Sequence, residues 1–83
     1  MKLKKLLVKL ARGEVENVAF SDFQRLIESH GFTLRRISGS HHIYRNPTIP
    51  KIVNIQDVGG QAKPYQVRQF LRLVERYELS MER

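Results

Sequence analysis

The chain has 83 residues, a formal net charge of +7 and an isoelectric point near 10.3. We therefore expect one small domain, and the lack of cysteine excludes a disulfide framework, a thiolate zinc site and a cysteine nucleophile. No apolar run reaches the roughly 18 residues of a membrane-spanning helix. The apolar start of the chain breaks at Lys9 without a cleavage pattern, so we expect a cytoplasmic protein that does not bind membranes.

Residues 1–13 are predicted to form a basic helix that ends at Gly13. Leucines at helical spacing indicate one apolar face, and cations lie on or beside the other face. Such a helix attracts polyanions, and a membrane-surface role is the alternative. The leucines are Leu3, Leu6, Leu7 and Leu10, and the cations are Lys2, Lys4, Lys5, Lys9 and Arg12.

A second helix is predicted over residues 21–30, and its ends are better marked. Ser21 is a natural N-cap, and Gln24 three positions later completes a capping-box pattern. Gly31 suits the position that follows the last helical residue. His30 closes the apolar face of this helix, so we expect it to be structural.

Three strands are predicted next, over residues 33–38, 41–46 and 52–56. Residues 39–40, a Gly-Ser pair, form a tight hairpin connection between the first two strands. Residues 46–50 contain two prolines and form a longer turn, because proline cannot donate to a strand ladder. Sequential strands with short connections form an antiparallel meander.

The last helix is predicted to begin at Pro64, which suits the first helical position. A Gly-Gly pair at 59–60 breaks the chain before this helix, and residues 78–83 are expected to fray. The buried stripe of the helix is Val67, Phe70, Leu71 and Val74, and its basic edge is Arg68, Arg72 and Arg76.

This order of elements predicts an α+β fold, with an α-β-β-β-α core over residues 18–76 of a single domain spanning 1–83. Because one helical face cannot bury itself, both core helices should pack on one face of a three-stranded antiparallel sheet. The other face is then left open to a partner. Residues 32–56 carry four cations and no acid, which favours nucleic acid or another polyanion as that partner.

Two of the three histidines, His41 and His42, follow the hairpin turn. Imidazole both accepts and donates protons near neutral pH, so either ring is a candidate catalytic group. Neighbouring strand residues point to opposite faces, so the two rings should not act as a pair or chelate one metal ion. The alternative is a structural role, with one ring packed and the other exposed.

Strand alternation pairs His41 with Ile43 on one face of the sheet and His42 with Tyr44 on the other. If Ile43 packs on the helices, His41 can reach a substrate only from the rim of the sheet. Tyr44 either stacks on an RNA base or packs half-buried against its neighbours. The sequence leaves both questions open.

Together these features resemble the HicA-type mRNA interferase toxins of bacterial toxin–antitoxin systems, over about residues 18–76. The resemblance implies a fold like that of double-stranded-RNA-binding domains, here with an extra N-terminal helix. The matching motifs are Gly31-Phe32, the Gly-Ser-His-His-Ile-Tyr segment at 39–44, Pro47 and residues 60–71.

The resemblance implies an endoribonuclease that cleaves messenger RNA and arrests translation until a cognate antitoxin of the HicB type blocks it. The catalytic histidine of the family directly follows the Gly-Ser pair, which makes it His41 here, with His42 as second choice. Many members carry a histidine after the third strand, where this chain has Asn-Ile-Gln-Asp at 54–57. The basic N-terminal helix also extends beyond the shortest members. We expect the free chain to be a monomer.

RNA supplies its own nucleophile, the 2′-hydroxyl, so we expect His41 to act as general base while cations neutralise the phosphate. This scheme needs no metal ion or cofactor, and the sequence shows no clear carboxylate cluster for a metal. The general acid stays unassigned among His42, Tyr44 and Lys63. A non-catalytic RNA-binding module and a protein–protein contact domain are the alternatives. The expected RNA contacts are Arg35, Arg36, Ser40, Tyr44, Arg45, Lys63, Arg68 and Arg72.

Overall fold

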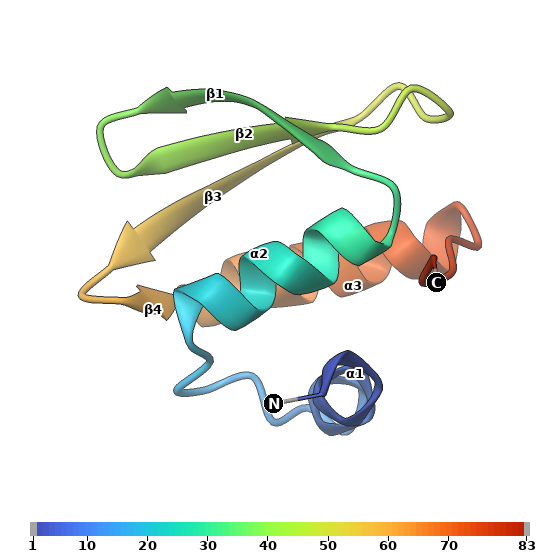
Figure 1. Ribbon diagram of the computed structural model, residues 1–83. Helices are drawn as coiled ribbons and strands as arrows, with labels where there is room; N and C mark the ends of the chain where they lie inside the picture. The colour runs from blue at the N-terminus through green and yellow to red at the C-terminus, as the bar shows by residue number, and fades with distance from the viewer. Residues whose placement is uncertain (1, 83) are drawn as a thin grey trace.

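The computed structural model describes residues 2–82 as three helices and one antiparallel sheet. Helices α2 and α3 cover one face of the sheet, and α1 lies on the far side of these two helices (Figure 1). The α+β fold with its helices on one sheet face is therefore confirmed. The elements are α1 (Leu3–Ala11), α2 (Phe20–Ser29), β1 (Thr33–Ser38), β2 (His41–Arg45), β3 (Ile52–Val58), β4 (Gln61–Ala62) and α3 (Pro64–Arg76).

The sheet has four strands in the order β1-β2-β3-β4, so the prediction of three strands is wrong. Gly59 and Gly60 both have positive φ angles, which lets the chain reverse at once. The two residues of β4 then pair with the end of β3, and Ala62 donates its N–H to the carbonyl of Val18 at 2.9 Å. A two-residue strand is too short to show an alternating pattern, so no sequence signal predicts it.

The core lies between the sheet and the two covering helices. Phe23 of α2 meets Phe70 of α3 edge to face, with ring centroids 5.8 Å apart. Tyr44 and Ile55 close this core from the sheet, and both are at most 1% exposed. Helix α1 adds a smaller contact on the other side of the helices through Leu6 and Leu10, as its leucine spacing predicts.

Helix α2 begins two residues earlier than its capping pattern predicts, because that pattern places the N-cap at Ser21. Its N-cap is Ala19, no side chain caps the helix, and Phe20 at its first position is buried. Gln24 does not complete a capping box, because its amide donates to the Tyr44 hydroxyl at 3.0 Å. Burial of the Phe20 ring outweighs one local capping bond, which is typically worth about 1 kcal/mol.

His30 and residues 78–82 lie at the far end of the helices, and both contact the rest of the protein. His30 is buried as expected, with Nδ1 2.8 Å from the Leu26 carbonyl oxygen and its ring edge-on to Phe70. The expectation that residues 78–83 fray is wrong for 78–82, because Leu79 and Met81 pack against the core. The Glu82 amide also donates to the Ser29 carbonyl. The last residue of that range lies outside the described part of the chain.

Tyr44 is fully buried in the centre of β2, and burial raises the pKa of its hydroxyl above the usual 10.0. We expect Tyr44→Ala to lower the free energy of unfolding by about 3–5 kcal/mol, since it leaves a ring-sized cavity. Tyr44→Phe removes only the partner of Gln24 and should cost about 1 kcal/mol. Urea denaturation measures both, and equal losses in the two variants would contradict the assignment of the ring to the core.

Candidate active site

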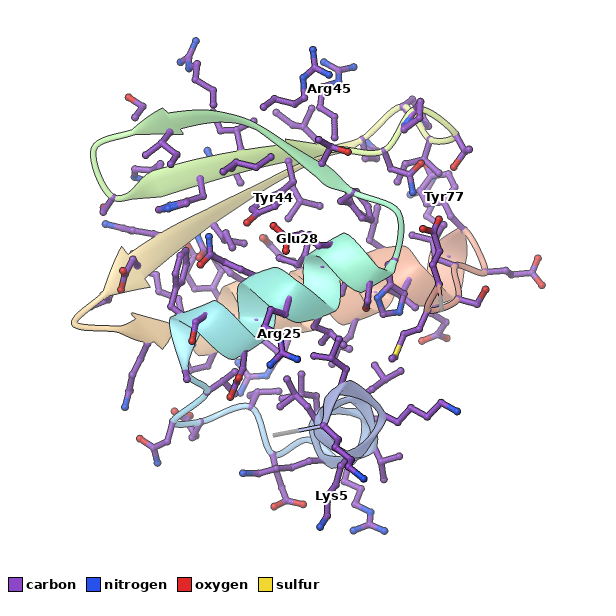
Figure 2. The ribbon with its side chains drawn as sticks, in the orientation of Figure 1. Lys5, Arg25, Glu28, Tyr44, Arg45 and Tyr77 are labelled. Atoms are coloured by element: carbon purple, nitrogen blue, oxygen red, sulfur yellow. The ribbon has the colours of Figure 1, made fainter. Side chains whose placement is uncertain are left out.

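Strand β2 presents alternate residues to opposite faces of the sheet, and the buried side is settled by Tyr44. His41, Ile43 and Arg45 therefore lie on the face that no helix covers, which we call the open face. Figure 2 shows Tyr44 between the sheet and α2 and Arg45 on the other side of the sheet. Ile43 is half-buried there and does not enter the core, so His41 is not confined to the rim.

His41 is exposed at the start of β2 and is held by one polar contact. Its Nδ1 lies 3.1 Å from the side-chain oxygen of Asn54 on the neighbouring strand. An amide oxygen only accepts, so the neutral ring must carry its proton on Nδ1 to donate here. The lone pair then lies on Nε2, which is the tautomer that a general base facing solvent requires.

Two arginines share the open face with His41. Arg36 of β1 pairs with Ile43, and residues directly opposite in a ladder project on the same side. Arg45 lies two residues beyond Ile43 on the same strand and is exposed. Within residues 2–82 the ion pair that forms is Arg25 with Asp22, so both open-face guanidinium groups are available to an anion.

The hairpin before His41 carries two further residues of the expected RNA-contacting set. A register shift between Leu34 and Arg36 leaves Arg35 as an extra, exposed residue beside the open face. Ser40 lies in the turn and is half-buried. Its carbonyl accepts the N–H of Asp57 at 3.0 Å, which ties the turn to β3 and fixes the position of His41.

The remaining expected contacts do not lie on this face. Tyr44 has no exposed surface, so it cannot stack on a base, and this expectation is wrong. Lys63 caps α3 and lies with its Nζ 5.7 Å from the ring of Tyr65. Arg68 and Arg72 are exposed on α3, which belongs to the helix layer behind the sheet (Figure 1).

His42 points toward the helices, as strand alternation predicts. Its ring packs edge-on against Phe20 with centroids 4.9 Å apart, and its Nδ1 lies 3.2 Å from the carbonyl oxygen of Ser40. These contacts give His42 a structural role. They also remove His42 as a partner for His41 on one substrate atom.

The contact between Asn54 and the His41 ring was not predicted from the sequence. Asn54 appeared only as a position where related chains carry histidine. The register of β2 and β3 would have predicted this contact, because Asn54 pairs with Ile43 and therefore lies diagonally opposite His41. Asn54 also lines a crevice of about 150 Å³ between β3 and α3.

The described part of the chain contains no cluster of three or more histidine, cysteine or acidic side chains that could hold a metal ion. Between residues 2 and 82, no helix is long and apolar enough to cross a bilayer. Within residues 2–82 this face offers the His41 imidazole, the Asn54 amide that contacts it and a set of guanidinium groups, and Ser38 and Gln56 lie directly opposite His41 in the ladder.

The different surroundings of the two rings predict different effects on stability. His42→Ala removes the packing on Phe20 and should lower the free energy of unfolding by about 1 kcal/mol. His41→Ala removes an exposed ring and should change it by less than about 0.5 kcal/mol. Thermal denaturation of both variants tests this, and a larger loss for His41→Ala would contradict the assignment of faces.

Comparison with protein families gives one match, to the model described as the HicA toxin of bacterial toxin–antitoxin systems, over residues 20–75. The match covers more than half of the chain and spans every element from α2 to the last turn of α3. Comparisons with curated proteins and with solved structures gave no match.

Proposed function

Because the chain belongs to the HicA toxin family of bacterial toxin–antitoxin systems, we propose that it acts as an endoribonuclease on messenger RNA and so blocks translation. The observation that carries this proposal is the exposed imidazole of His41, with Nδ1 bound to Asn54 and Nε2 free. It stands on a basic face that no helix covers (Figure 1).

His41 is the general base of the proposed reaction. Its Nε2 takes the proton of the ribose 2′-hydroxyl, whose oxygen attacks the adjacent phosphorus and displaces the 5′ oxygen of the next nucleotide. The products are a 2′,3′-cyclic phosphate and a 5′-hydroxyl. The 5′ oxygen takes its proton from solvent, since His42 and Tyr44 point to the other face.

Arg36 and Arg45 have an electrostatic role in this scheme. The pentacoordinate phosphorane carries more negative charge than the phosphodiester from which it forms. Guanidinium groups placed beside it stabilise the transition state more than the ground state, which is what raises a rate. Both side chains lie on the same face as His41, and Arg35 lies beside them.

We propose that the antitoxin of the pair is of the HicB type and covers the open face. A face with unpaired arginines and an exposed imidazole attracts acidic side chains as well as phosphates. A partner that binds there competes directly with RNA.

His41→Ala tests the base. We expect it to lower the rate of RNA cleavage by at least about 10²-fold, the usual contribution of a positioned base, while the circular dichroism spectrum stays unchanged. Cleavage by the wild-type chain should persist in EDTA, since no step needs a metal ion. Salt-sensitive RNA binding without cleavage by the wild-type chain would instead favour a non-catalytic RNA-binding module.

Asn54 is a positioning residue in this scheme, and two substitutions separate its effects. Asn54→Ala loses one hydrogen bond of about 1 kcal/mol and should slow cleavage roughly fivefold. Asn54→Asp places a carboxylate beside the ring, which stabilises imidazolium, so the acidic limb of the pH–rate profile should move to higher pH. Cleavage profiles from pH 5 to 9 measure both, and two unchanged profiles would contradict the role of Asn54.

A further inference from the structure

Helix α1 carries a cationic surface on the side that faces away from the rest of the protein. Leu6 and Leu10 bury one side of the helix, and Figure 2 shows Lys5 pointing away from α2 and the sheet. The opposite side forms a shallow hollow with Glu14 at its end. We call the residues of this hollow the lysine surface, and they are Lys4, Lys5, Val8, Lys9 and Arg12.

The charges of the lysine surface do not stabilise the helix that carries them. The first turn of α1 contains no acid, so Lys4 and Lys5 lie near the positive end of the helix dipole. Lys5 and Lys9 are four residues apart and repel each other. Among the described residues none of these cations forms an ion pair. The packing of Leu6 and Leu10 holds the helix, and its cations add to its stability only when an external anion lies beside them.

The lysine surface is separate from the candidate active site. The family match begins at residue 20, so α1 lies outside it. The α2 and α3 layer stands between α1 and the sheet (Figure 1). The molecule measures 30 × 29 × 21 Å along its principal axes. Lys5 points away from this layer and His41 lies on the sheet face beyond it, so one phosphate cannot contact both side chains.

We propose that the lysine surface is a second RNA-binding site, which holds phosphates of the substrate strand outside the segment that His41 cleaves. The identity of the polyanion as RNA rests on the proposed function. A stacked strand advances about 3.4 Å per nucleotide, so roughly nine nucleotides are needed to span the molecule. The site therefore acts only on RNA longer than this, and it raises affinity without entering the chemistry.

The composition of α1 favours RNA over a membrane surface as the ligand. The helix has nine residues and no aromatic side chain, whereas interfacial helices anchor through tryptophan or phenylalanine. Val8 is the one large apolar side chain of α1 that is exposed, with 51% of its surface accessible. Backbone phosphates need only closely spaced cations, and a contact of this kind carries no sequence preference.

The test reverses two charges of the lysine surface in the double variant Lys4→Glu and Lys5→Glu. Glutamate in the first turn suits the helix dipole, so α1 is expected to stay folded. The matched control, Lys51→Glu with Arg76→Glu, makes the same change in net charge at exposed positions outside α1. The ligands are single-stranded RNAs of 5 and 20 nucleotides that share one central sequence.

Affinity is measured in the His41→Ala background, where the RNA stays intact, and cleavage in the wild-type background. We expect the α1 variant to bind the 20-nucleotide RNA roughly tenfold more weakly than the control variant, with a salt slope lower by about 1.4 for two lost phosphate contacts. Cleavage of the 5-nucleotide RNA should proceed at the same rate in the α1 and control variants.

Equal loss of affinity in the α1 and control variants would overturn the inference, because only net charge would then matter. Unchanged RNA affinity, together with lost binding to phosphatidylserine vesicles, would overturn it in favour of a membrane surface. If the wild-type chain cleaves neither RNA but the α1 variant still loses affinity for the longer one, the proposed nuclease activity fails and the second binding site stands.

Discussion

The burial of Tyr44 is the constraint on which the rest of the site depends. Its ring enters the core beneath the sheet, and strand alternation then places His41 on the opposite, open face. A shift of one residue in the β2 register would exchange these faces and bury the imidazole that now meets solvent. The same side chain therefore stabilises the core and, from three residues away, determines whether the candidate base is accessible.

The two sides of the molecule carry their cations for different reasons. On the open face, Arg36 and Arg45 lie around an oriented imidazole, so charge and a proton acceptor meet at one place. On α1, the lysine surface has charge without any group that could transfer a proton. Because α2 and α3 separate the two sides, a bound strand must be long to meet both. Under the two proposals made above, this layered arrangement would let RNA affinity and cleavage vary independently.

Local sequence patterns predicted most helices and strands, because each has a clear apolar periodicity or a glycine or proline that marks its end. The span of β1 matched its prediction, and α3 begins at the proline that marks its first turn. The signals failed where a tertiary contact competed with them. Burial of Phe20 moved the start of α2 away from Ser21, and the two residues of β4 form a strand only because β3 and Val18 lie beside them. Residues Leu79 and Met81 likewise pack because a core surface is within reach.

From the sequence, periodicity predicts the fold class, and the motifs that resemble the HicA toxins indicate the family; His41 is proposed as the base through that resemblance. Packing in three dimensions sets which face His41 occupies, brings Asn54 to its ring and buries Tyr44 away from solvent. The physical reason is that alternation gives two equivalent faces until something covers one of them. That choice is made by packing between segments far apart in the chain, which no local pattern encodes.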